Sequence, residues 1–233
     1  MMLLLGGRPR DFDVVFMDCD GVLFDSNAMK SDAIAAAVAG YPPGDVTRLV
    51  ELHLDQGGIS RHAKLRRFFT EIHPVDDVEA ALAEALDKFG AHSKRAYAAL
   101  DPIPAALDFV EALRGCSVNV VSGTDQAELR EVFAAKGLMA RFADVLGSPT
   151  TKPVHLRRVL DAAGVAAARA VMIGDGRGDF QAAREVGMPF VFLAAYSDWA
   201  SAAVALEGEP NVYVARDWAE LSSWLPSGDG HAQ

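Results

Sequence analysis

The chain has 233 residues, of which 51% are apolar and 23% charged, and its formal net charge is −10. This composition is typical of a folded domain with a sizeable core, and the acidic balance argues against a nucleic-acid-binding surface. The apolar run at residues 1–5 is shorter than a signal-peptide core, and no run approaches the ~20 residues that cross a membrane, so we expect a cytoplasmic protein with no nucleic-acid and no membrane partner.

A short apolar strand followed by acidic residues opens the chain. Residues 14–17 are β-branched, aromatic or otherwise apolar, as in a buried strand, and Asp18, Asp20 and Gly21 come directly after them. Open α/β sheets bind ligands at the carboxyl ends of their strands. Two carboxylates this close repel each other unless a cation or a shared proton relieves them, and oxygen donors favour Mg²⁺. A strand followed by an Asp-rich turn without function fits the same residues.

Residues 27–100 are predicted to be helical throughout. Apolar residues recur at helical spacing in three segments: 33–37, 65–72 and 78–89. The glycines and prolines at 40–44 break the first segment. Because this block lies between two β-rich parts, we predict an inserted all-helical cap, with the core formed by residues 1–26 and 101–233.

After residue 101 strands and helices alternate. The predicted strands are 118–121, 143–146, 170–173, 190–193 and 212–214. The predicted helices are 107–113, 127–136, 154–163, 179–186 and 218–225. This alternation indicates an α/β fold in which a Rossmann-like parallel sheet carries helices on both faces.

Three further segments place polar residues at strand ends. Ser122 and Gly123 follow the strand at 118–121, where a hydroxyl and free N–H groups suit a phosphate oxygen. The same segment fits a helix N-cap, with Ser122 or Thr124 as the capping residue. Lys152 precedes a helix, a place that the helix dipole disfavours, so a role in neutralising a phosphoryl group would explain it. An exposed loop lysine is the alternative.

The last of these segments is acidic and rich in glycine. The strand at 170–173 ends in Gly174 and Asp175, and Asp179 follows four residues later. The glycines allow the backbone and the carboxylates to crowd around one point. Asp179 alone could equally be the N-terminal cap of the next helix.

The four segments, in this order and around one helical insert, resemble the motifs of the haloacid dehalogenase superfamily. The resemblance covers residues 12–225 and is strongest to the phosphoglycolate phosphatase and β-phosphoglucomutase-like subgroup with a helical cap. It implies that Asp18 is a nucleophile that becomes an aspartyl-phosphate, and that Asp20 protonates the leaving group and then activates water.

The same resemblance assigns the remaining site residues. It implies that Ser122 and the N–H of Gly123 bind the phosphate, together with Lys152. It implies a Mg²⁺ ion held by four residues: Asp18, Asp20, Asp175 and Asp179. Of these, Asp20 would contribute its backbone carbonyl, and Asp179 would hold a metal-bound water or Lys152.

A loop in the predicted cap contains the candidate residues for binding the substrate. Residues 58–61, Gly-Ile-Ser-Arg, resemble the cap loop of β-phosphoglucomutase-like enzymes and related phosphatases. This makes Ser60, Arg61 and Lys64 candidates for contacting the leaving group. A capping serine with a solvated basic face is the alternative.

The sequence therefore predicts a Mg²⁺-dependent phosphatase that acts on a small phosphorylated metabolite. The main alternative is a β-phosphoglucomutase-like sugar-phosphate mutase, but those enzymes carry a histidine where this chain has Lys30. A non-catalytic binding module has little need for the whole set of charged residues. The identity of the substrate and the oligomeric state, monomer or homodimer, are left open.

Overall fold

A six-stranded parallel sheet forms the centre of the computed structural model, which describes residues 1–57, 59–113 and 115–226. Its strands are β3 (Val14–Met17), β4 (Ser117–Asp125), β5 (Asp144–Ser148), β6 (Ala170–Gly174), β7 (Phe190–Leu193) and β8 (Val212–Ala215). Their order across the sheet is β5-β4-β3-β6-β7-β8, and every pair is parallel. β3, the strand that precedes the first acidic motif, is therefore central.

Helices cover both faces of this sheet, as predicted. They are α5 (Pro104–Ala112), α6 (Gln126–Ala135), α7 (Lys152–Ala163), α8 (Arg177–Val186), α9 (Ala202–Leu206) and α10 (Trp218–Ser223). Successive side chains of β3 point to opposite faces. Val15 and Met17 belong to a core cluster with residues of α5, α6 and α10, whereas Val14 and Phe16 pack with residues of α7, α8 and α9. A strand buried on both faces needs an uninterrupted apolar run, which is what made β3 recognisable.

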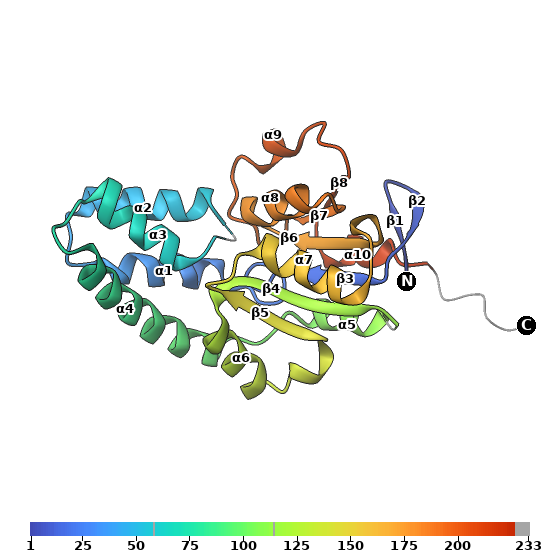
Figure 1. The fold of residues 1–233 in the computed structure, drawn as a ribbon, viewed down its shortest axis with the longest axis horizontal. Helices are drawn as coiled ribbons and strands as arrows, with labels where there is room; N and C mark the ends of the chain where they lie inside the picture. Colours follow the sequence, from blue (N-terminus) through green and yellow to red (C-terminus); the bar gives the residue numbers. More distant parts are fainter. Residues whose placement is uncertain (58, 114, 227–233) are drawn as a thin grey trace, which may run out of the picture.

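Between β3 and α5 the described residues form helices without a strand. These are α1 (Asn27–Ala37), α2 (Pro43–Asp55), α3 (Arg61–Arg67), the π-helical turn η1 (Phe68–Ile72) and α4 (Val78–Ala99). They have their own hydrophobic core, which includes Leu49, Phe68 and Phe89. Figure 1 shows them as a separate lobe beside the edge where the sheet strands end. The inserted helical cap is thus present, and we propose residues 27–100 as its extent.

The cap differs from its prediction in two places. The Gly- and Pro-rich segment 40–44 was expected only to break a helix, but Pro43 begins α2. Proline suits the first turn because its fixed φ is helical and the N–H that it lacks has no partner there. The helix predicted at 65–72 changes at Phe68 from α-helical to π-helical hydrogen bonding.

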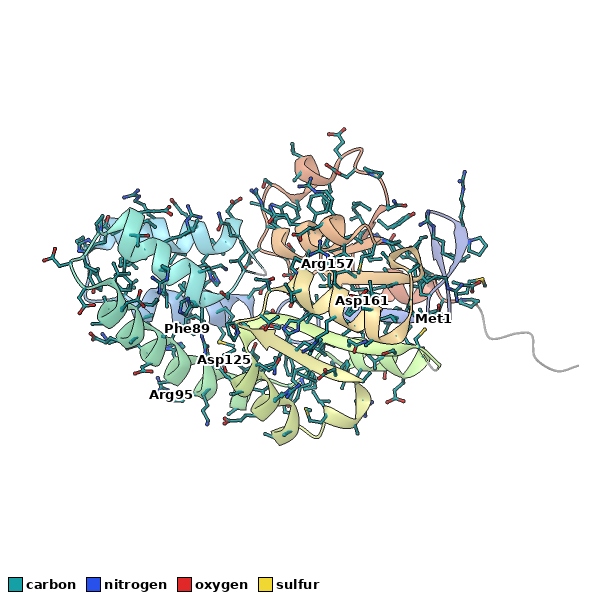
Figure 2. The ribbon with its side chains drawn as sticks, viewed as in Figure 1. Met1, Phe89, Arg95, Asp125, Arg157 and Asp161 are labelled. Atoms are coloured by element: carbon teal, nitrogen blue, oxygen red, sulfur yellow. The ribbon has the colours of Figure 1, made fainter. Side chains whose placement is uncertain are left out.

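An N-terminal hairpin and the short helix α9 were not predicted. The hairpin pairs β1 (Met2–Leu5) with β2 (Arg8–Asp11), joined by Gly6 and Gly7 at φ values of 58° and 73°. Two adjacent glycines of positive φ form the turn that two-residue hairpins require, so this signal was readable in the sequence. The hairpin lies at the end of the core away from the cap, where Figure 2 labels Met1.

Across the described residues, no helix combines the length and apolar character needed to traverse a membrane.

Candidate active site

The predicted catalytic residues meet at one edge of the sheet, next to the cap. Asp18 follows β3, Asp175 follows β6, and Lys152 begins α7 shortly after β5. Since β3 lies between β4 and β6, and β5 flanks β4, the carboxyl ends of these strands converge. Figure 2 shows Asp125, at the end of β4, on the side of the core that faces the cap.

The segment around Ser122 has a different secondary structure from the one predicted. β4 continues to Asp125, so Ser122 and Gly123 lie inside the strand, not in a turn after it. Asp125 is the N-cap of α6, which excludes Ser122 and Thr124 from that role. The buried Ser122 hydroxyl accepts a hydrogen bond from the N–H of Thr124 at 3.1 Å. Among the described residues this hydroxyl donates no hydrogen bond, so its own proton is available to a ligand.

Three buried carboxylates and one lysine form the centre of the site. Carboxylate oxygens of Asp18, Asp175 and Asp179 lie within 4.8 Å of one another. Lys152 Nζ lies 2.7 Å from Asp18 Oδ1 and also pairs with Asp179. These ion pairs account for a lysine in the first turn of α7. One ammonium group therefore faces three carboxylates.

The cluster carries excess negative charge. Burial and the nearby charge of Asp179 raise the pKa of Asp18 to about 7, although Lys152 opposes the shift. Burial and the charges of Asp18 and Asp179 also raise the pKa of Asp175 well above its usual value. Burial alone would lower the pKa of Lys152, but the two carboxylates outweigh it and raise that pKa. A second cation would relieve this repulsion.

The cluster fits a hard divalent cation such as Mg²⁺, which prefers oxygen ligands. We expect Asp18 and Asp175 to bind it, because Asp179 is held by both Lys152 and the N–H of Gly176. Asn27 Nδ2 donates to Asp175 Oδ2 at 2.7 Å and so holds that carboxylate in place. The glycine at position 21 leaves room beside it, because a Cβ there would overlap the Asp175 carboxylate.

Asp179 and Asp20 are the other two residues predicted to bind the metal. Asp179 pairs with Lys152, one of the two partners predicted for it, and accepts from the N–H of Gly176 at 3.0 Å. The Asp20 carboxylate lies outside the group of three. Its predicted contact with the metal, through the backbone carbonyl, stays a prediction.

We expect Gly21→Ala to weaken Mg²⁺ binding by about 10- to 100-fold, the loss typical when groups around a metal site are disturbed. The added Cβ would displace the Asp175 carboxylate, and the φ of 73° at this position disfavours a side chain. Calorimetric titration with Mg²⁺ measures the effect. Gly7→Ala is the matched control, because Gly7 has the same φ of 73° and nothing within 4 Å of an added Cβ. Unchanged affinity in Gly21→Ala would argue against Asp175 as a ligand.

Asp20 lies in a separate network of hydroxyl groups. Its Oδ1 accepts from Ser26 Oγ at 2.5 Å and from the Tyr97 hydroxyl, and its Oδ2 accepts from Thr124 Oγ1 at 3.2 Å. Lys30 Nζ lies 3.5 Å from the same carboxylate. Burial would raise the pKa of Asp20, but Lys30 and the three hydroxyls together lower it. The surroundings of Asp20 therefore lower its pKa, whereas those of Asp18, the other aspartate of the first motif, raise its pKa.

The structure separates the three predicted substrate residues of the cap. Ser60 caps α3 by accepting from the N–H of Ala63 at 3.3 Å, and it lines a cavity beside Lys152. Arg61 pairs with Glu128 of α6 at 2.6 Å. Both Arg61 and Lys64 line the cavity of about 70 Å³ between the cap and the Asp18 carboxylate.

Further contacts bring the cap loop onto the core. The Gly57 carbonyl accepts from the N–H of Gly178 at 2.8 Å, and Asp55 pairs with Arg177 at 2.8 Å. Both core partners lie between Asp175 and Asp179 in sequence. The cap loop thus rests directly on the turn that carries the predicted metal ligands.

Sequence reasoning missed several residues of the site. Tyr97 is one of them, although its spacing from Phe89 placed it on the buried face of α4. Lys30 was considered only as a replacement for histidine, yet it donates to Thr124 Oγ1 at 2.7 Å. No sequence signal pointed to the pairing of Asp55 with Arg177.

Comparisons with known proteins identify a family by sequence and a shared fold by structure. Residues 12–187 match the sequence profile of the haloacid dehalogenase-like hydrolases. A phosphoglycolate phosphatase of Rhodospirillum rubrum is 28% identical over 232 residues, which covers 92% of this chain and 93% of that protein. A hydrolase from Pseudomonas syringae has a similar fold, with a TM-score of 0.72 at 17% identity over 91% of this chain and 96% of the other. A haloacid dehalogenase superfamily hydrolase of subfamily IA from Geobacter sulfurreducens has a TM-score of 0.58 at 18% identity, over 91% and 95% of the two chains.

Proposed function

The chain belongs to the haloacid dehalogenase-like hydrolases, and on this premise we propose that it is a Mg²⁺-dependent phosphatase that hydrolyses a small phosphate monoester through an aspartyl-phosphate. The observation that carries the proposal is the different surroundings of Asp18 and Asp20. Asp18 lies among buried carboxylates beside Lys152, whereas Asp20 is held by hydroxyl groups away from that cluster. This difference supports attack on phosphorus by Asp18 and proton transfer by Asp20.

In the first half-reaction an Asp18 oxygen attacks the phosphorus, and the bond between phosphorus and the alcohol oxygen breaks. Asp20 donates a proton to that oxygen, so a neutral alcohol leaves. Lys152 and the Ser122 hydroxyl orient the phosphoryl oxygens and offset their charge. Because its surroundings lower the pKa of Asp20, the acid step requires a proton that binds with the substrate. An incoming phosphate dianion favours such uptake, since like charge raises a carboxyl pKa.

In the second half-reaction a water molecule attacks the phosphorus of the aspartyl-phosphate, and Asp20 takes its proton. The bond between phosphorus and the Asp18 oxygen breaks, which releases inorganic phosphate and restores Asp18. The lowered pKa of Asp20 suits this base step. Mg²⁺ held by Asp18 and Asp175 would stabilise the negative charge on the phosphoryl oxygens. Contacts of the cap with the core would keep bulk water out during the reaction.

The test is phosphate release from p-nitrophenyl phosphate and a panel of small phosphate esters, with Mg²⁺ and with EDTA. We expect release that depends on the metal and favours one ester. The named activity of the Rhodospirillum rubrum relative supports hydrolysis over the mutase alternative. Interconversion of hexose phosphates primed by a bisphosphate, without release of phosphate, would overturn the proposal in favour of the mutase.

We expect Asp20→Asn to lower kcat by about 10²- to 10⁴-fold, the usual contribution of general acid–base catalysis. Mg²⁺ affinity should change little, because the Asp20 carboxylate lies outside the carboxylate cluster. Steady-state kinetics and calorimetry measure the two quantities. A variant that lost Mg²⁺ affinity but kept its kcat at saturating metal would refute the proton-transfer role.

A further inference from the structure

The turn between Asp175 and Asp179 is held by the cap as well as by the core. Gly178 is the second residue of α8, where a backbone N–H has no partner within the helix. The Gly57 carbonyl of the cap accepts from this N–H at 2.8 Å. The two backbones are packed closely, because a Cβ added at Gly176 would lie 2.8 Å from the carbonyl carbon of Gly57. A group of the cap thus completes the start of α8.

An ion pair ties the same turn to Asp55, the last residue of α2. Arg177 Nη2 lies 2.8 Å from Asp55 Oδ1 and also donates to Ser201 Oγ at 3.2 Å. The guanidinium group lies 5.5 Å from the centroid of the Trp199 ring. Trp199 is buried, and its Nε1 donates to Ser201 Oγ at 2.9 Å. These core contacts hold Arg177 in the orientation in which it meets a carboxylate of the cap.

Asp175, at the start of this turn, contacts the cap directly. Its Oδ2 accepts at 2.7 Å from Nδ2 of Asn27, the first residue of α1. Its backbone carbonyl accepts from Ser197 Oγ at 2.6 Å, which fixes the turn from the core side. Three residues of the cap therefore hold the turn that carries the predicted metal ligands: Asn27, Asp55 and Gly57.

The cap contacts oppose a repulsion within the metal site. Carboxylate oxygens of Asp18, Asp175 and Asp179 lie within 4.8 Å of one another, and without a cation such groups repel each other. A turn held only by the core could relax away from this arrangement. Because the cap holds the turn in place, a docked cap favours the geometry that a metal ion needs. By thermodynamic linkage, a bound metal ion must then favour the docked cap by the same factor.

We propose that Asp55 and Arg177 are positioning residues for the metal site: their ion pair clamps the turn 175–179 to the cap, so that Mg²⁺ binding and docking of the cap favour each other. This inference rests on the Mg²⁺ site of the proposed function, but it does not require hydrolysis. Metal loading would thereby prepare the cap for closure over a substrate, and closure would tighten the hold on the metal.

The first test is calorimetric titration of Mg²⁺ into Arg177→Gln and Asp55→Asn. We expect each variant to bind Mg²⁺ about fivefold more weakly than the wild type, the upper end of what a partly exposed ion pair contributes. The direction in Arg177→Gln is decisive, because loss of a positive charge would by itself strengthen cation binding. The double variant should lose no more than either single one, because both break the same pair. Arg177→Lys keeps the charge and should stay within about twofold of the wild type.

Glu131→Gln is the matched control. Glu131 of α6 pairs with Lys94 of the cap at 2.8 Å, so this variant also loses an ion pair between cap and core, but one formed with α6 instead of with the turn 175–179. Its Mg²⁺ affinity should equal that of the wild type. An unchanged or higher affinity in Arg177→Gln would overturn the inference, as would an equal loss in Glu131→Gln. Thermal unfolding in EDTA checks that each variant folds.

Hydrogen exchange at the Gly178 amide measures the reverse effect. This N–H donates to a carbonyl of the cap, so its protection reports whether the cap is docked. Saturating Mg²⁺ should slow its exchange about fivefold more in the wild type than in Asp55→Asn, as reciprocity requires. Equal slowing in the two proteins would refute the coupling even in an active phosphatase. Failure of the wild type to bind Mg²⁺ would instead refute the proposed metal site, and the inference with it.

Discussion

Asp18→Asn should abolish turnover, by about 10⁴-fold or more, as when other catalytic nucleophiles are removed. An asparagine amide at this position cannot form the aspartyl-phosphate, whereas the packing around it is preserved. The folded protein should be at least as stable as the wild type without metal. In the wild type Asp18 is buried beside Asp179, and its pKa of about 7 shows that the ionised form is disfavoured there. A neutral amide removes that repulsion.

The measurement combines steady-state kinetics with acid quenching of the wild type during turnover. Mass spectrometry of the peptide that contains Asp18 should show a phosphoryl group in the wild type and none in the variant. Asp25→Asn is the control, because Asp25 belongs to the same motif but is exposed, and its activity should match the wild type. Normal turnover by Asp18→Asn, or a phosphoryl group on another residue, would refute the assignment of the nucleophile.

The catalytic core was predictable because topology alone brings its residues together. Strands buried on both faces have continuous apolar sequences, so β3 and β6 could be identified without structural data. Parallel strands end at one edge of the sheet, and a residue that follows such a strand must lie there. The approach of Asp18 to Asp175, from strands far apart in the chain, follows from this rule.

Contacts that depend on how the cap rests on the core could not be predicted in the same way. Tyr97 and Asp20 are 77 residues apart, and nothing in the spacing of α4 says which core group its buried face meets. Arg61 was expected at the substrate because basic residues gather near the start of α3. Its partner is Glu128, on a helix of the core, and only the three-dimensional arrangement shows this pairing.

The contacts of Lys64 could not be predicted from the sequence either. Four basic residues other than histidine lie between positions 61 and 67, and the sequence cannot distinguish those that are paired from the one that is not. Arg66 and Arg67 pair with Glu79 and Glu71 on the cap surface. The absence of a carboxylate near Lys64, among the described residues, is a property of the packing of α2 against α3. Only the structure therefore shows that Lys64 contacts His53 instead of a carboxylate.

Lys152→Met should remove activity and also destabilise the protein by about 3–5 kcal/mol at pH 8 without metal, the usual result of breaking a buried ion pair. Methionine fills much of the same volume but leaves Asp18, Asp175 and Asp179 without their ammonium partner. The lost stability is thus electrostatic in origin. It should be partly restored by Mg²⁺, because a metal ion can balance the same carboxylates.

The pH dependence distinguishes this cause from lost packing. The pKa of Asp18 is raised from 3.8 to about 7 by folding, and that of Asp175 is raised as well. A carboxyl of raised pKa binds a proton in the folded chain before it does so in the unfolded chain, so the folded state gains stability as the pH falls through about 7 towards 3.8. Without Lys152, which lowers the pKa of Asp18, this gain begins at a higher pH and is larger. The deficit of Lys152→Met relative to the wild type should therefore shrink between about pH 8 and about pH 5.5.

Urea denaturation at both pH values, in EDTA and in Mg²⁺, measures this deficit. Lys94→Met is the control, because Lys94 pairs with Glu131 on the surface and its side chain is 71% exposed. Removing such a pair should change the free energy of unfolding by less than about 1 kcal/mol, with little dependence on pH over the same range. A deficit of Lys152→Met that was equal at both pH values and insensitive to Mg²⁺ would mean that Lys152 stabilises the site by packing. In that case the charge balance proposed for the Asp18 cluster would be wrong, because its carboxylates would tolerate the loss of their only ammonium partner among the described residues.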